Sequence, residues 1–331
     1  MTESFGTLLR HLRRQLGLSQ PELARMVPIS QSSLSRYEAD RQAPTLTVAE
    51  RLDDLLSAGG GLRNAARAVT VVQAITPDDV DRIDHHIRYP SCVDACTVRA
   101  LSDLLAAQRR LDDTLGPQPV LPMATSHMRT VLGMVRAARG PHRTGLVEVA
   151  SQCFQFTGWL HAELGNQHDA VHHLAEAESL ADEAGNGVLA AQVAGFRGAM
   201  ARQNGNARAT VRWFMSEYHA SDAHIAQRVG AAAQAAQGYA VLGERDAALR
   251  LLDTAGNLID VAARDEPPAT AYWLTPTYHR LNFGLAHLAL NDHEAAADHL
   301  AAGLASLPAE QLGSEWVQEY KDAHERALER R

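Results

Sequence analysis

The chain has 331 residues, of which 46% are hydrophobic and 5% aromatic, so it is long enough for two domains with buried cores. Its net charge of −8 excludes a protein that coats nucleic acid over its whole surface, and any contact with DNA must be local. Abundant Ala, Leu, Arg and Glu, without a run of alternating β-branched and aromatic residues, predict an all-α fold.

Apolar residues with the period of a helix open the chain. They are Phe5, Leu8, Leu9, Leu12 and Leu16. Gly17 follows them, a residue typical of a helix C-terminus. Ser19 and Glu22 then form a capping-box pattern, which predicts that a short second helix begins there.

A third helix is predicted after Ser30, which is a favourable N-cap residue. Its inward positions hold Leu34 and Tyr37, and its outward face holds only polar side chains. These outward residues are Gln31, Ser32, Ser35 and Arg36. Arginine and glutamine can bond bidentately to guanine and adenine edges, and serine reaches phosphates or bases. We therefore predict a helix that reads DNA; the alternative is a solvated polar face on a small helical bundle.

Residues 5–56 resemble the phage-repressor-like helix-turn-helix family of the XRE class. The segments that carry the resemblance are LRRQLGLSQPELA and SQSSLSRYEADRQAPT, followed by a closing helix. The resemblance implies two sets of contacts with double-stranded DNA. Base edges would be read by Gln31, Ser32 and Arg36, and phosphates would lie near Ser19, Gln20 and Arg41.

The same resemblance implies that Glu38 pairs with Arg13 of the first helix, which suits a half-buried carboxylate. The alternative is a pair of plain surface charges. The family usually has glycine between its two motif helices, whereas Pro28 takes that place here, so we expect the turn to differ locally. Residues 1–44 have a net charge of only +2. Such weak attraction to DNA favours a homodimer that binds two half-sites.

Ala58 to Gly61 is the clearest linker in the sequence. We therefore predict a helix-turn-helix DNA-binding domain at residues 1–61, a helical connector or cap at 62–140 and a helical-repeat domain at 141–331. Within the connector, a helix over about 93–115 is predicted, ended by a proline-rich break at residues 117–122. The connector could cap the array that follows or supply a dimer contact.

From about residue 145, a pattern of helix, turn and second helix recurs. The turns are Leu164-Gly165-Asn166, Asn204-Gly205-Asn206, Leu242-Gly243-Glu244 and Leu290-Asn291-Asp292. Small residues follow at matching offsets in three units, whereas the second unit has Arg208 and Glu217 where small or aromatic residues are expected. This section resembles a tetratricopeptide-like α-solenoid. The alternative is an arbitrary all-α bundle.

A solenoid of this type has a concave surface lined by the first helix of each pair. The candidate ligand-binding residues on those helices are Gln152, Gln155, Trp159, Arg202, Gln234, Gln237, Tyr278 and Asn282. Amide side chains can pair with both the N–H and the C=O of an extended peptide, so a peptide is one ligand class that this set would suit.

The sequence offers no metal site, cofactor motif or catalytic constellation. His168 and His172 have the i, i+4 spacing of metal ligands, but nothing completes the set. We therefore predict no enzyme, no metal and no cofactor. Three cysteines do not form a disulfide framework, and no signal-like or long apolar stretch is found, so we expect a cytoplasmic protein without membrane contact.

These features together predict a dimeric, sequence-specific transcription regulator whose helical-repeat domain senses an effector. The layout resembles bacterial peptide-pheromone-responsive regulators, which implies a short peptide as the first guess; a small molecule or a protein partner stays open. The alternative is a protein-interaction scaffold whose helix-turn-helix head serves assembly rather than DNA binding.

Overall fold

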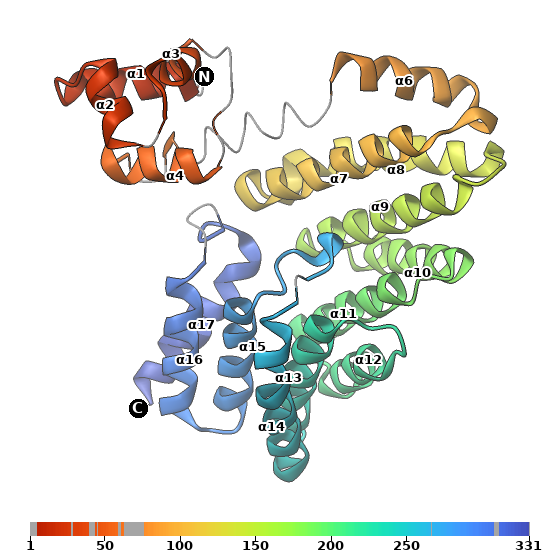
Figure 1. Ribbon diagram of the computed structural model, residues 1–331. Helices are drawn as coiled ribbons and strands as arrows, with labels where there is room; N and C mark the ends of the chain where they lie inside the picture. Colours follow the sequence, from red (N-terminus) through yellow and green to blue (C-terminus); the bar gives the residue numbers. More distant parts are fainter. Residues whose placement is uncertain are drawn as a thin grey trace. The chain divides into compact units, whose positions relative to one another are not determined.

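The computed structural model describes residues 5–27, 29–39, 44, 46–58, 61–62, 76–265, 267–307 and 311–330. These residues form helices and connecting segments without a β-strand, which confirms the all-α prediction (Figure 1). The chain divides into two compact units, residues 1–80 and 81–331. The domain boundaries at residues 61 and 140 stay predictions.

The first unit contains four described helices. They are α1 (Phe5–Gln15), α2 (Gln20–Met26), α3 (Gln31–Glu38) and α4 (Leu46–Leu55). Their apolar faces meet in one core, and its most deeply buried members include Phe5, Leu9, Leu23, Leu34 and Leu52. Leu16 is 55% exposed, so the inward stripe of α1 ends before this residue.

The predicted caps of the first unit are confirmed. The Ser19 N–H donates to the Glu22 carboxylate at 2.8 Å, and the Ser19 hydroxyl accepts from the Glu22 N–H, which completes the capping box of α2. At α3, the Ser30 hydroxyl accepts from the Ser33 N–H at 3.1 Å. The predictions made on Pro28 and Arg41 lie outside the described residues.

The second unit is a sequence of antiparallel helices, and its first members are α6 (Pro77–Arg88), η1 (Pro90–Cys92), α7 (Ala95–Leu115) and α8 (Pro117–Ala137). Helix α6 begins in the last residues of the first unit. The predicted helix at 93–115 is confirmed as α7. The predicted proline-rich break is wrong in extent, because Pro117 begins α8 and Pro122 lies inside it. The N–H groups of a first helical turn have no intrahelical partner, so Pro117 and Pro119 remove no bond there, whereas Pro122 is tolerated inside the helix at the loss of one backbone hydrogen bond.

Four helix pairs follow. They are α9 (Arg143–Glu163) with α10 (Gln167–Ala184), α11 (Gly187–Gln203) with α12 (Ala207–His219), α13 (Ile225–Val241) with α14 (Arg245–Ala262), and α15 (Pro276–Ala289) with α16 (His293–Ala305). Each predicted turn contains a residue with positive φ: Gly165 at 74°, Gly205 at 68°, Gly243 at 81° and Asn291 at 60°. The short helix η2 (Ala269–Ala271) precedes α15, and α17 (Glu315–Glu329) packs on α15 and α16. The second unit is therefore solenoid-like.

The early and late helices of the second unit meet at Asp113, near the end of α7. Its carboxylate accepts hydrogen bonds from the Tyr272 hydroxyl at 2.9 Å and the Gln311 amide at 3.1 Å. Its carbonyl accepts from the Ser314 hydroxyl at 2.9 Å. These hydrogen bonds thus join α7 to segments near the C-terminal end of the second unit. No helix in the described ranges is long and apolar enough to cross a bilayer.

Candidate nucleic-acid interface and ligand cavity

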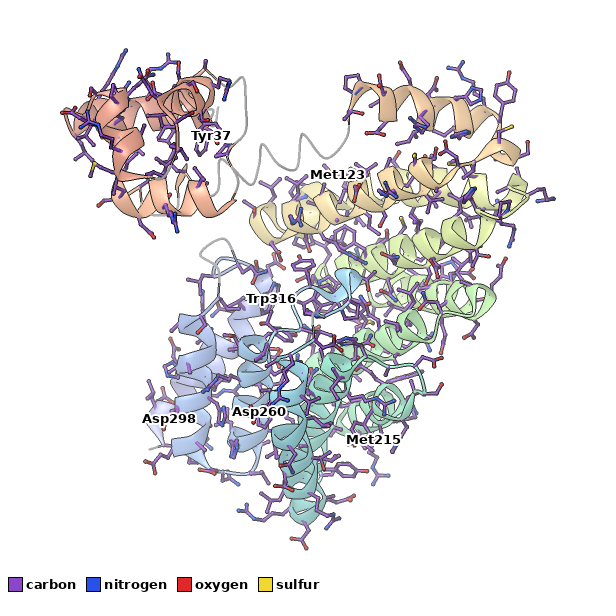
Figure 2. All side chains as sticks on the ribbon, in the orientation of Figure 1. Tyr37, Met123, Met215, Asp260, Asp298 and Trp316 are labelled. Atoms are coloured by element: carbon purple, nitrogen blue, oxygen red, sulfur yellow. The ribbon has the colours of Figure 1, made fainter. Side chains whose placement is uncertain are left out.

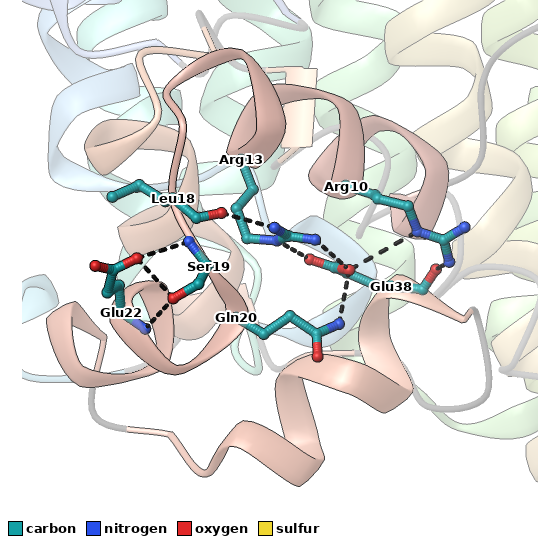
Figure 3. A network of polar contacts seen from close by, with 7 residues as sticks. All are labelled: Arg10, Arg13, Leu18, Ser19, Gln20, Glu22 and Glu38. Carbon is teal, nitrogen blue, oxygen red and sulfur yellow. Dashed lines mark hydrogen bonds and ion pairs between the residues drawn. The ribbon is translucent and has the colours of Figure 1, made fainter.

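The outer face of α3 is held in place by one buried carboxylate at its C-terminal end. Glu38 is 3% exposed, and the Arg13 guanidinium donates to both of its carboxylate oxygens, at 2.5 and 3.0 Å. Gln20 of α2 donates to the same carboxylate at 2.9 Å, and Arg10 donates to the Glu38 carbonyl (Figure 3). A third Arg13 bond reaches the Leu18 carbonyl at 2.7 Å, which fixes the chain before α2. Glu38 therefore joins α1, α2 and α3.

The Glu38 network is electrostatically satisfied. Burial alone would raise the pKa of the Glu38 carboxyl, but hydrogen bonds from Arg13 and Gln20 and the charges of Arg13 and Arg10 outweigh it, so this pKa lies below its usual value. The hydrogen bond to Glu38 likewise raises the pKa of Arg13. The implied pairing of Glu38 with Arg13 is present in the structure.

The predicted DNA-facing residues of α3 are all exposed, namely Gln31, Ser32, Ser35 and Arg36. Among the described residues, Arg36 makes only a long contact, 3.4 Å from its guanidinium to the Ser33 hydroxyl. Ser19 is exposed at the start of α2, whereas the half-buried Gln20 uses its amide in the Glu38 network. These four side chains are thus exposed, whereas Glu38, at the C-terminal end of the same helix, is buried in its network.

The second unit contains a cavity of about 140 Å³ on the inner side of its helices. Its aromatic lining residues are Phe156, Trp159, Phe196, Phe214, Tyr272, Trp273, Tyr278, Trp316 and Tyr320. Its charged lining residues are Arg109, Asp112, Asp113, Arg202, Glu217 and Glu319. Trp316 of α17, labelled in Figure 2, shows where the last helix contributes to this wall. An aromatic wall with a few charged groups is the usual composition of a small-molecule site.

Half of the predicted ligand-binding residues line this cavity: Trp159, Arg202, Gln234 and Tyr278. The others lie elsewhere. Gln155 and Asn282 are fully buried, where Gln155 donates to the Leu189 carbonyl at 3.0 Å and Asn282 accepts from the Tyr320 hydroxyl. Gln152 is also buried, and Gln237 lines a separate hollow.

The cavity residues that sequence analysis did not propose as ligand-binding include four acids, Asp112, Asp113, Glu217 and Glu319. Burial, together with neighbouring carboxylates, raises the pKa of Asp112 to about 7 and that of the adjoining Glu163 to about 9. One carboxylate oxygen of each is buried without a hydrogen-bond partner. Within the described part of the chain, no three His, Cys, Asp or Glu side chains are grouped as a metal site requires.

Glu217 of α12 is the most isolated of these acids. It is 6% exposed, and burial raises the pKa of its carboxyl well above the usual value. By contrast, Arg202 is ion-paired with Glu319. The sequence did carry a signal for Glu217, because it is one of the two residues that break the repeat pattern in the second unit.

One comparison with known protein families agrees with the geometry of the first unit. A family model described as a helix-turn-helix domain matches residues 4–66, so the N-terminal unit is a helix-turn-helix domain. Among solved structures, the chain is similar to the crystal structure of Bacillus thuringiensis PlcR in complex with the peptide PapR7 and DNA. The two chains are 14% identical, with a TM-score of 0.39, over 98% of this chain and 99% of that chain. No curated protein matches the chain.

Proposed function

We propose that this protein is a sequence-specific DNA-binding transcription regulator that acts as a homodimer and responds to an effector bound by its helical body. One observation carries the proposal. The exposed face of α3 presents amide, hydroxyl and guanidinium groups, while the buried Glu38 network fixes the helix that bears them. Rigid placement matters because base readout needs hydrogen-bond groups at fixed positions in the major groove.

In this proposal, α3 is the recognition helix. Gln31, Ser32 and Arg36 contact base edges, with Ser35 beside them on the same exposed face. Ser19 at the start of α2 lies near the DNA backbone, where a helix N-terminus favours a phosphate. Arg41 remains a predicted phosphate contact.

A dimer follows from the weak charge of the head. With a net charge of +2 over residues 1–44, one head gives little non-specific attraction, and two heads on one duplex multiply the specific contacts. We expect two half-sites whose centres are about one helical turn of DNA, or a multiple of it, apart.

The cavity of the second unit is the proposed effector site. It combines aromatic walls with charged side chains, three of which (Arg109, Asp112 and Arg202) have one buried polar atom without a hydrogen-bond partner among the described residues. Four of the eight residues predicted for ligand binding line it. A ligand that stabilises one arrangement of the dimer needs only about 1–3 kcal/mol of coupling to change DNA affinity 5- to 150-fold. A short peptide, a small molecule and a protein partner remain the effector classes.

A gel-shift titration of full-length protein on genomic fragments tests DNA binding. We expect specific complexes that weaken steeply with salt, and a loss of about ten- to hundredfold in affinity for Arg36→Ala. Arg99→Ala is the matched control, because Arg99 is an exposed arginine of α7 and its removal changes the net charge equally. Absent or salt-insensitive binding by folded protein would instead support the interaction scaffold.

A further inference from the structure

Glu217 occupies a position where the other helix pairs have a small residue. It lies twelve residues after Gly205, and the equivalent residues in the other units are Ala177, Ala255 and Gly303. All three are buried against the first helix of their pair. In the α15–α16 pair, a side chain added at Gly303 would lie 2.5 Å from Leu281, so a large residue on the first helix meets glycine on the second.

In the α11–α12 pair, the glycine is on the first helix and the large residue is on the second. Gly195 of α11 takes the place that Leu281 has in α15, and Glu217 takes the place of Gly303. A side chain added at Gly195 would lie 2.7 Å from a Glu217 carboxylate oxygen, so the glycine makes the room that this carboxyl fills. The exchange accounts for the volume of the Glu217 side chain. It does not account for the carboxyl group, because leucine or methionine would fill the same space without a desolvation cost.

The Glu217 carboxyl has no partner among the described residues. No hydrogen bond or ion pair reaches it, although it is 6% exposed and lines the cavity. The cations of the cavity wall are engaged elsewhere. Arg202 pairs with Glu319, and Arg109 donates to the Thr270 carbonyl at 3.2 Å and lies 6.0 Å from the Phe156 ring. A buried, unpaired carboxyl that faces a cavity is suited to a positive charge brought by a ligand.

The cavity wall as a whole has more acidic than basic side chains. Two arginines face four carboxyl groups, and one arginine and one carboxylate neutralise each other. The remaining Arg109 is outnumbered by Asp112, Asp113 and Glu217. One nitrogen of the Arg109 guanidinium is buried without a partner, so it can donate to an oxygen on the ligand.

The aromatic wall supplies the second half of a site for an organic cation. Trp159, Phe196 and Trp273 form a row with ring centroids 5.5 and 5.9 Å apart, and Phe196 directly follows Gly195 in α11. Aromatic faces attract cations and also bury an apolar ligand body. The cavity volume of about 140 Å³ is that of roughly ten waters, so it suits a ligand group with on the order of ten non-hydrogen atoms.

We propose that this cavity binds a small organic cation, an amine or guanidine with an apolar body the size of one ring. Its positive group pairs with Glu217, and its body packs against the row of Trp159, Phe196 and Trp273. The regulatory meaning of this ligand rests on the proposed function, in which the cavity is the effector site. The binding itself does not depend on DNA.

Calorimetric titration of full-length protein without DNA tests the site. The probes are 2-phenylethylamine and 3-phenylpropionate, which share a ring and differ in the sign of the charge. We expect the amine to bind at least about tenfold more tightly than the carboxylate, because only the amine can pair with Glu217. Glu217→Gln should weaken amine binding about ten- to hundredfold. Glu244→Gln, at an exposed glutamate after Gly243, should leave it unchanged.

Three results would overturn the proposal. The first is stronger binding of 3-phenylpropionate than of the amine, and the second is undiminished amine binding by folded Glu217→Gln. The third is the absence of amine binding up to about 10 mM, which is well above the Kd of a ligand this small. If Glu217→Gln fails to fold, the comparison of the two probes on the unchanged protein still tests the proposal. Because the titrations contain no DNA, their failure would leave DNA binding by α3 standing, and a failed gel shift would leave the cation site standing.

Discussion

Each unit of the protein buries a glutamate, and the two glutamates are in opposite electrostatic states. In the helix-turn-helix unit, Glu38 accepts hydrogen bonds from Arg13 and Gln20, and its pKa lies below the usual value because these partners outweigh burial. In the helical body, Glu217 is almost as buried but has no partner among the described residues, and burial raises its pKa. The Glu38 carboxyl is hydrogen-bonded within the first unit, whereas the Glu217 carboxyl has no such bond among the described residues.

The difference indicates how each unit is stabilised. Removing one member of a buried pair leaves an uncompensated charge, so Glu38 should be required for the fold of the head. A buried acid without a partner should cost stability in the free protein, so Glu217 should be dispensable for the fold of the body. The predictions below test this contrast, beginning with the largest effect.

Glu38→Gln should lower the free energy of unfolding of the first unit by about 3 kcal/mol, because Arg13 would stay buried without its counter-charge. All four tryptophans lie in the second unit, so tryptophan fluorescence follows the unfolding of that unit alone. Circular dichroism follows both units. The part of its urea-dependent change that fluorescence does not follow is therefore the transition of the first unit. Glu22→Gln is the control, since Glu22 is exposed and only caps α2, with an expected loss below about 1 kcal/mol. Equal losses in the two variants would contradict a special role for Glu38.

The contributions of Glu38 and Glu217 to stability should change with pH in opposite directions. Glu38 has a lowered folded pKa, so its contribution is present above about pH 4.3, the usual glutamate value, and is lost as the pH falls through the folded pKa. Glu217 and Glu163 have raised folded pKa values and keep their protons after the unfolded chain has released them. The stability difference between the unchanged protein and Glu217→Gln should therefore grow as the pH rises above about 4.3, because the variant lacks the proton that the unfolded chain releases. Urea unfolding of both proteins at several pH values measures this difference, and a difference that shrinks with rising pH would refute the assignment.

Glu217→Gln should stabilise the free second unit at pH 7 by more than the exposed control does, because an amide of the same shape carries no ionisation cost. The measurement is urea unfolding followed by tryptophan fluorescence. Glu244→Gln serves again as the exposed control and should change stability by less than about 0.5 kcal/mol. A loss of stability in Glu217→Gln would mean that the carboxyl has a structural partner after all.

Gly195→Ala should have the smallest effect, because two terms oppose each other. Alanine favours a helix interior over glycine by about 0.5–1 kcal/mol, but its methyl group would lie 2.7 Å from the Glu217 carboxyl, which must move. The same change in a Glu217→Ala background meets no carboxyl and should stabilise by about 1 kcal/mol. A thermal-unfolding double-mutant cycle measures the difference, and purely additive effects would show that the two residues do not interact.

The head was predictable from sequence because its determinants are local. The capping box of Ser19 and Glu22, the N-cap Ser30 and the inward Leu34 all act within a few residues, and each is found as predicted. The proline-rich stretch was misjudged because proline breaks a helix interior but suits a first turn, and the sequence alone did not show that a helix starts at Pro117.

The body was predictable in its repeats but not in its cavity. Turn glycines specify where helix pairs reverse, whereas the cavity is built by helices far apart in sequence. Glu217 entered the sequence analysis only as an irregularity of the second unit. Its significance depends on Gly195, and that contact appears only when α11 and α12 are packed together. The polar faces used to choose ligand residues also include positions that bond to neighbouring helices, as Gln155 does.

The junction at Asp113 has a consequence for how the body comes apart. An open repeat array touches only its nearest neighbours and can lose its terminal helices one pair at a time. Here the Ser314 hydroxyl and the Asp113 carbonyl are joined across 201 positions of sequence, with Gln311 and Tyr272 on the same aspartate. The α15–α16 pair cannot leave the array until these hydrogen bonds to Asp113 break, so we expect α7 to α16 to unfold as a single cooperative block.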